Sequence, residues 1–208
     1  MKKFINKRIC LPLGQFGSYK ICVSGAASGH CTIDAKSKAE DIGQAIAEQG
    51  AILLTGATTG IPDSAAKAAK ANGGFSLGFS PAATVKEHVN KYRLPTENYD
   101  VIVYTGTGYA GRNLLLTRAS DAVIIVCGRI GTLNEFTVAF EDHKIIGILV
   151  NSGGITNEIP RILNIAQRGT GHIIYDTDPK RLIKKVMQAV SVDYKKNGLK
   201  PVRKKGSY

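Results

Sequence analysis

The chain has 208 residues and a formal net charge of +12, and 43% of its residues are hydrophobic while 21% are charged. This composition excludes an intrinsically disordered protein and fits one globular domain with an ample core. No apolar run reaches the roughly 18 residues of a membrane span, and residues 1–10 are not followed by the apolar stretch of a signal peptide, so we expect a cytoplasmic protein without a membrane partner.

Predicted strands and helices alternate along the chain. Short apolar runs predict strands at residues 19–23, 51–54, 75–79, 101–104, 122–126, 145–150 and 172–175. Helical periodicity is found at residues 35–49, 63–71, 84–91, 112–119, 131–141, 156–166 and 180–192. Several strands are apolar on both faces, which is typical of a parallel sheet covered by helices on each side. We therefore predict a single α/β, Rossmann-like domain with a central parallel sheet of about seven strands and helices on both faces.

The positive charge is concentrated at the two ends of the chain. Residues 1–10 carry four basic side chains and no acid, and residues 179–208 carry ten basic side chains against Asp193 alone. The central part is therefore close to neutral, which favours solvated tails over a face that reads nucleic acid and leaves only weak contact with nucleic acid through those tails. The predicted divisions are a basic N-terminal segment (1–18), the Rossmann-like domain (19–192) and a basic C-terminal tail (193–208).

The four cysteines do not suggest a metal site. They are Cys10, Cys22, Cys31 and Cys127, and no two of them form a C-x-x-C pair. Cys22 and Cys127 lie inside or beside predicted buried strands. We expect buried, reduced thiols, because free cysteine is among the most buried residue types.

Glycine-rich segments follow four of the predicted strands, at residues 24–29, 56–60, 106–111 and 128–132. The carboxyl ends of parallel strands meet at one edge of a sheet, where ligands of such folds bind. Ordinary tight turns between strand and helix also favour glycine, so the clusters alone do not define a site.

Two common nucleotide motifs are absent from the sequence. The loop from Gly25 to Gly29 is not G-x-G-x-x-G, and the second strand ends at Thr55 and Gly56 without the carboxylate that binds a ribose in dinucleotide folds. No G-x-x-x-x-G-K-[ST] sequence occurs either. Both an NAD-type and an ATP-type site are therefore disfavoured.

The segment from Arg112 to Glu135 carries the most specific pattern. Arg112 lies nine residues before Asp121, and Asp121 lies fourteen residues before Glu135. Gly131 and Thr132 are predicted to open a helix, so their N–H groups and the Thr132 hydroxyl can hold a phosphate. Glu135 lies one helical turn further along, within reach of an attached sugar.

This segment resembles the LONELY GUY (LOG) family of cytokinin-activating phosphoribohydrolases and relatives labelled "possible lysine decarboxylase". Residues 127–135 (CGRIGTLNE) stand where the family has P-G-G-x-G-T-x-x-E, and residues 55–74 resemble its earlier glycine-rich turn and helix. The resemblance spans residues 19–190. It implies cleavage of the N-glycosidic bond of a nucleoside 5′-monophosphate, giving free base and ribose 5-phosphate, by a homodimer without a metal or organic cofactor.

The residue roles follow the same resemblance. Arg112 and Glu135 would be catalytic. The phosphate and nucleotide would be bound by the glycine loops and by the start of the helix near residue 131, through Ser24, Gly25, Gly29, Gly56, Gly111, Gly128, Arg129, Gly131 and Thr132.

Departures from the family pattern point to particular branches of it. Cys127 replaces the proline, Arg129 replaces a glycine, and Asn113 stands where cytokinin enzymes have lysine. The chain is thereby nearer to less characterised bacterial relatives and to the molybdenum-cofactor carrier proteins. The alternative to a hydrolase is consequently a non-catalytic carrier or sensor of a phosphorylated pterin or nucleotide. A third reading is a protein that contacts nucleic acid through its basic ends, in the manner of DNA-processing protein A.

Overall fold

The structure is a computed structural model, and it describes residues 19–29 and 31–199. The predicted N-terminal segment (1–18), Cys10 and residues 200–208 of the predicted tail lie outside the described residues.

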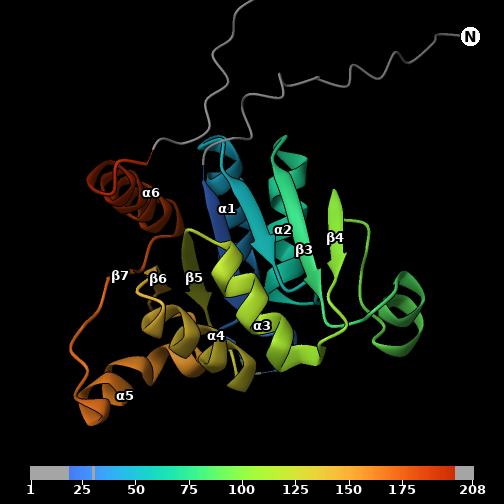
Figure 1. The fold of residues 1–208 in the computed structure, drawn as a ribbon. Helices are drawn as coiled ribbons and strands as arrows, with labels where there is room; N and C mark the ends of the chain where they lie inside the picture. Colours follow the sequence, from blue (N-terminus) through green and yellow to red (C-terminus); the bar gives the residue numbers. More distant parts are fainter. Residues whose placement is uncertain (1–18, 30, 200–208) are drawn as a thin grey trace, which may run out of the picture.

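A seven-stranded parallel sheet forms the centre of the molecule, with strand order β4-β3-β2-β1-β5-β6-β7 (Figure 1). The strands are β1 (Lys20–Gly25), β2 (Ile52–Thr55), β3 (Phe75–Ser80), β4 (Val101–Tyr104), β5 (Ala122–Val126), β6 (Ile145–Leu149) and β7 (Ile173–Asp176). From β1 the chain adds β2, β3 and β4 on one side, and it then returns to add β5, β6 and β7 on the other. The direction of winding reverses between β1 and β5, so the crevice where such folds bind ligands lies at the carboxyl ends of these two strands.

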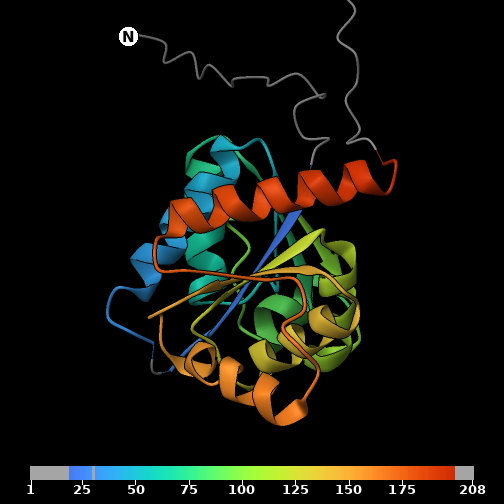
Figure 2. The same cartoon turned by 90° about the vertical axis from the view of Figure 1, so that its left-hand side faces the viewer.

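Six α-helices are present in residues 19–29 and 31–199. They are α1 (Ala35–Glu48), α2 (Ile61–Ala71), α3 (Gly108–Ala119), α4 (Ile130–Glu141), α5 (Ile159–Ala166) and α6 (Pro179–Lys196), with a π-helix η1 (Glu87–Lys91) and a 3₁₀-helix η2 (Gly154–Asn157). Helices α1, α2 and α6 pack over one face, and α3 and α4 over the other (Figures 1 and 2). The predicted fold class is confirmed.

Alternate residues of the central strands build two separate cores. Ile21 of β1 and Ile124 of β5 face α1, α2 and α6, whereas Val123 of β5 faces Leu116 of α3 and Phe136 of α4. β5 and β6 are buried along their whole length, so their continuous apolar runs follow from burial on both faces. This rigid centre fixes the positions of the loops at the carboxyl edge.

Several helix boundaries differ from those predicted. Helix α3 begins at Gly108, four residues before the predicted start, so part of the predicted 106–111 glycine loop is the first turn of a helix. The predicted 156–166 helix is divided into η2 and α5, and Pro160 in the first turn of α5 favours a new helix start there. Helix α6 continues to Lys196, four residues past the predicted end.

The prediction of reduced thiols is wrong for two cysteines. Cys31 and Cys127 form a disulfide, with Cα atoms 5.6 Å apart, while Cys22 is a free, buried cysteine. The two residues are 96 positions apart in the chain, and a spacing rule cannot detect such a pair. Cys31 follows β1 and Cys127 follows β5, and these strands are hydrogen-bonded neighbours, so the loops that leave them meet at one edge.

Candidate functional site

A cavity of about 340 Å³ lies beside the carboxyl ends of β1 and β5. Its volume is within the usual range of small-molecule sites, roughly 300–1,000 Å³. The loops after β1 and β2 and the first turns of α3 and α4 surround it. The lining residues are Val23, Ser24, Gly25, Ala26, Ala27, Ser28, Gly56, Thr58, Pro62, Tyr109, Arg112, Asn113, Arg129, Ile130, Gly131, Thr132 and Glu135.

A buried ion pair forms one wall of the cavity. Arg112 of α3 and Glu135 of α4 are 5% exposed each, and Arg112 Nη1 donates to Glu135 Oε1 over 2.9 Å. Ser24 at the end of β1 donates its hydroxyl hydrogen to the other carboxyl oxygen, Oε2. Three elements that are distant in sequence are therefore joined at a single carboxyl group.

Burial raises the pKa of the Glu135 carboxyl above its usual range. Desolvation is the largest cause, because it penalises the charged form. The Arg112 charge and the hydrogen bonds from Ser24 and Arg112 act in the opposite direction but do not cancel it. Glu135 is therefore a group that holds a proton more readily than an exposed glutamate does.

Close packing restricts the Arg112 side chain. A Cβ at Gly56 would clash with its guanidinium, so glycine at the end of β2 leaves the room that this side chain needs. The guanidinium carbon lies 5.9 Å from the ring centre of Tyr109, a cation–π distance. Arg112 Nε is buried without a hydrogen-bond partner among the described residues, so this wall retains one donor without an acceptor.

The first turn of α4 borders the cavity at an uncapped helix end. Its N-cap residue is Arg129, and no side chain caps the helix there. Gly131 and Thr132 follow within the first turn, where N–H groups have no partner inside the helix. A helix start with exposed N–H groups and a guanidinium beside it favours an anion such as a phosphate.

Eight of the predicted site residues line this cavity together. They are Ser24, Gly25, Gly56, Arg112, Arg129, Gly131, Thr132 and Glu135. That these residues bind or act on a ligand stays a prediction.

Gly29, Gly111 and Gly128 are not among the lining residues. Gly111 lies inside α3, where a Cβ would crowd Thr107. Gly128 has a φ of 103° and sits where a Cβ would clash with Thr132, so it shapes the turn before α4. Gly29 is next to the Arg129 side chain, outside the cavity wall.

Sequence reasoning missed several polar and aromatic members of the wall. Asn113, noted only as a departure from a family lysine, hydrogen-bonds Asn134 Oδ1 over 3.0 Å and Gly131 O over 3.4 Å, and thereby ties α3 to the first turn of α4. Tyr109 is in the G-Y-A-G segment and Ser28 in the first glycine loop. Their places in glycine-rich segments next to predicted site residues were the only signal available.

The described residues contain neither a candidate metal site nor a helix that could cross a membrane. Within 19–29 and 31–199, no three His, Cys, Asp or Glu residues come together in a way that could hold a metal ion. No helix in that part of the chain has the length and apolar character needed to cross a membrane.

Two solved structures share the fold over most of their length. The molybdenum cofactor binding protein of Rippkaea orientalis is 26% identical, with a TM-score of 0.69 over 83% of this chain and 98% of that one. The molybdenum cofactor carrier protein of Chlamydomonas reinhardtii is 24% identical, with a TM-score of 0.68 over 84% and 99% of the two chains.

Sequence comparison gives the family. An uncharacterized protein of Archaeoglobus fulgidus is 32% identical over 130 residues, which are 62% of this chain and 79% of that protein. The model of the SLOG cluster4 family matches residues 18–183. Together with the structural neighbours, this match supports the predicted LOG-like superfamily. Because the match covers most of its length, the chain belongs to the SLOG cluster4 family.

Proposed function

We propose that the chain binds a small phosphorylated ligand in the cavity beside the carboxyl ends of β1 and β5 and acts as a carrier or sensor, as the branch of molybdenum-cofactor carrier proteins does. The observation that carries this proposal is the uncapped start of α4 beside Arg129, on the wall of a 340 Å³ cavity. The structural likeness to a molybdenum cofactor binding protein at 26% identity supports it.

The charges of the wall favour an anion at the α4 end of the cavity. The Arg112 guanidinium is paired with Glu135, whereas the only hydrogen bond we find for the exposed Arg129 side chain among the described residues is a long one of 3.5 Å from Nη1 to Ser28 Oγ. A phosphate next to Arg129 would gain charge-assisted hydrogen bonds from its guanidinium and from the N–H groups of Gly131 and Thr132. A flat ring on the phosphate, as in a pterin or a purine, would meet the exposed side chains of Tyr109 and Ile130.

A specific observation favours hydrolysis as the second candidate. Glu135 is a buried carboxyl whose pKa is raised, as expected for a general acid or base. In a phosphoribohydrolase, water would attack the anomeric carbon and give its proton to Glu135. The bond from that carbon to the base nitrogen would break, and the base would leave with a proton.

The contacts of Glu135 favour the carrier over the hydrolase. Oε1 accepts from Arg112 and Oε2 accepts from Ser24, so both oxygens are already engaged. A general base needs an oxygen that faces the attacking water. In this arrangement one lone pair on each oxygen is used to hold β1, α3 and α4 together, so fewer lone pairs of Glu135 are left for a water or a substrate in the cavity.

The test exposes the purified protein to AMP, GMP, CMP, UMP and a phosphorylated pterin. Calorimetry measures binding, and chromatography measures release of free base. Tight binding without release supports the carrier. Release that Glu135→Gln abolishes while binding persists would establish the hydrolase instead. Absence of binding to all five compounds would contradict the proposal.

The remaining expectations are part of the same proposal. A homodimer follows from the family resemblance, and sedimentation velocity checks it. Residence in the cytoplasm and weak contact of the basic ends with nucleic acid are checked by cell fractionation and by a salt titration of RNA binding.

A further inference from the structure

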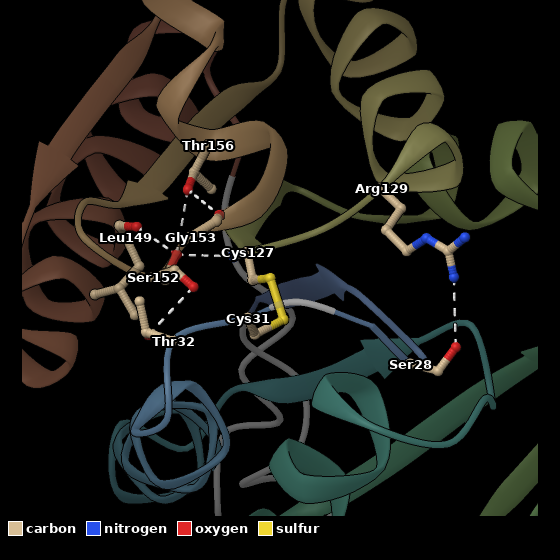
Figure 3. Close-up of a disulfide and its surroundings, with 9 residues drawn as sticks. All are labelled: Ser28, Cys31, Thr32, Cys127, Arg129, Leu149, Ser152, Gly153 and Thr156. Carbon is tan, nitrogen blue, oxygen red and sulfur yellow. Dashed lines mark hydrogen bonds between the residues drawn. A yellow bond between two sulfur atoms is a disulfide. The ribbon is translucent and has the colours of Figure 1, made fainter.

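The Cys31–Cys127 disulfide joins the two loops that form the mouth of the ligand cavity. Residues 26–34 leave β1, and residues 127–129 leave β5 and lead into α4. Ser28 lies three residues before Cys31, Arg129 lies two residues after Cys127, and both line the cavity. Figure 3 shows the disulfide next to the pair in which the Arg129 guanidinium points to Ser28.

The cross-link is placed where the sheet no longer holds the two loops. Strands β1 and β5 pair up to Gly25 and Val126, and Cys127 is the next residue. Their ladder therefore fixes the strands without the disulfide. Past the ends of the two paired strands, the disulfide joins the two loops. The exposed side chains of Arg129 and Ser28 also join them, through a contact of 3.5 Å.

The backbone on each side of the disulfide makes different hydrogen bonds with the segment that follows β6. The Cys127 N–H donates to Ser152 Oγ over 2.8 Å, and that hydroxyl donates to Leu149 O, so the β5 side rests on the buried end of β6 (Figure 3). On the β1 side, Thr32 N and Thr32 Oγ1 donate to Ser152 O over 3.2 and 3.3 Å. These bonds begin only after Cys31. The stretch from Ala27 to Gly29, in which Ala27 and Ser28 line the cavity, is exposed and lies before them.

The backbone at Cys127 has an unusual conformation. Its φ of 57° is in the left-handed region, which residues other than glycine seldom adopt. The next residue, Gly128, has a φ of 103° and leads directly to the first turn of α4. A change in the backbone at Cys127 is therefore transmitted to Arg129 and to the N–H groups that would hold a phosphate.

We propose that the Cys31–Cys127 disulfide is a redox-sensitive latch beside the cavity: when it is oxidised the two loops are held in the arrangement that binds ligand, and when it is reduced the loop after β1 loosens at Ser28 and Gly29. The start of this loop is also held by Ile61 N–H, which donates to Ala26 O over 3.0 Å, and by Thr59 Oγ1, which donates to Ala27 O over 3.1 Å, so loosening is expected after Ala27. The effect on ligand affinity rests on the proposed function.

The chemistry is thiol–disulfide exchange with a dithiol. One thiolate of the dithiol attacks the sulfur of Cys31, which is partly buried whereas Cys127 is fully buried, the S–S bond breaks, and Cys127 leaves as a thiolate and takes up a proton. The second thiol of the dithiol closes on the first and releases Cys31 as a thiol. Two electrons and two protons pass to the protein, and the reductant becomes a cyclic disulfide. A disulfide oxidant such as oxidised glutathione reverses the change.

The decisive measurement needs no ligand. Hydrogen exchange of the intact chain is followed by mass spectrometry before and after treatment with dithiothreitol. Reduction should speed exchange in peptides that cover residues 26–31 by about tenfold or more, because local opening becomes easier. Peptides from β6 and α6 serve as the internal control and should not change.

Variants separate the disulfide from other effects of the reductant. Cys31→Ser should show fast exchange in the same peptides, and dithiothreitol should change it no further. Cys127→Ser provides the same comparison if the first variant does not fold. Equal exchange in oxidised and reduced wild type would overturn the proposal, and so would the absence of a Cys31–Cys127 linked peptide from protein purified without a reductant.

Titration with AMP, before and after reduction, tests the consequence for the site. Affinity that falls at least about fivefold on reduction supports the latch, since a less ordered loop must be ordered again on binding. Faster exchange with unchanged affinity overturns control of the site. If AMP binds neither form, that result counts against the proposed function for this ligand, and the exchange measurement alone decides the latch.

Discussion

Arg112 Nη1 and Glu135 Oε1 are 2.9 Å apart in a wall where both side chains are almost fully buried. Removing two opposite charges from water carries a desolvation cost that their attraction does not always repay. The raised pKa of Glu135 shows that burial outweighs the Arg112 charge at this carboxyl. The pair is therefore best understood as a hydrogen-bonded joint between α3, α4 and β1, and this view leads to two predictions about stability.

The first prediction concerns the hydrogen bonds of Glu135. Glu135→Ala removes the acceptor of both Ser24 and Arg112, and each buried donor left without an acceptor costs about 1–3 kcal/mol. Glu135→Gln keeps an oxygen for Arg112 and an amide for the Ser24 hydroxyl, so it should lower the free energy of unfolding less than Glu135→Ala does, although both variants leave the buried Arg112 charge without its partner. Urea denaturation at pH 7 compares the two. Equal losses in both variants would show that the charge, and not the hydrogen bonds, stabilises the joint.

The second prediction concerns pH. Because the folded-state pKa of Glu135 lies above its unfolded value of 4.5, the folded chain binds more protons between these two values. The free energy of unfolding contributed by this group therefore falls as pH rises from 4.5 through the folded pKa. The difference between wild type and Glu135→Gln, measured by denaturation from pH 4 to pH 8, isolates the effect. If the free energy of unfolding of wild type rises relative to that of Glu135→Gln as the pH increases, the predicted direction of the effect is wrong.

The central part of the fold could be predicted because its signals are local. The continuous apolar runs of β5 and β6 and the alternation of strands with helices define a covered parallel sheet without any long-range information. Arg112 and Glu135 belong to one segment whose order of helix, strand and helix was predicted, and the family resemblance assigned both residues to one site.

The missed features depend on contacts between segments that are distant in the chain. The disulfide joins residues 96 positions apart, and although Cys127 begins the 127–135 block, nothing in that block points to Cys31. Asn113 binds the start of α4 only because α3 packs beside that helix. The carboxyl oxygens of Glu135 are both engaged because Ser24 arrives from β1. None of these contacts can be recognised from the periodicity or the composition of the sequence.

The third prediction uses the glycine that makes room for Arg112. Gly56→Ala would drive a methyl group into the guanidinium, displace it from Glu135 and weaken ligand binding. Gly131→Ala is compared for stability only, because Gly131 lines the cavity itself; a Cβ there meets no protein atom within 4 Å, so this variant should stabilise α4 by up to about 1 kcal/mol. Calorimetry with AMP and thermal denaturation report the two effects. Normal AMP affinity in Gly56→Ala would show that the position of Arg112 does not matter for the ligand.

The fourth prediction concerns the contribution of the disulfide to stability. A cross-link between residues this far apart restricts the unfolded chain, and its loss should lower the free energy of unfolding by about 2–4 kcal/mol. Dithiothreitol should therefore lower the denaturation midpoint of wild type. The Cys31→Ser variant should start at the lower midpoint and not respond. If dithiothreitol does not change the denaturation midpoint of wild type, the disulfide does not stabilise the fold.

The fifth prediction tests Arg129 as the phosphate contact. Its guanidinium is exposed at the cavity wall beside the uncapped start of α4, and its hydrogen bond to Ser28 is long. Replacing a charge-assisted hydrogen bond to phosphate with a neutral one costs about 1.5 kcal/mol or more, so Arg129→Gln should weaken AMP binding by about tenfold or more. The dependence of binding on salt should also become weaker, because one charge contact with the phosphate is lost. Arg168→Gln is the matched control, since Arg168 makes an exposed ion pair with Glu141 and does not line the cavity. If the two variants bind AMP with equal affinity, the phosphate does not contact Arg129 at the start of α4, and the proposed site is wrong.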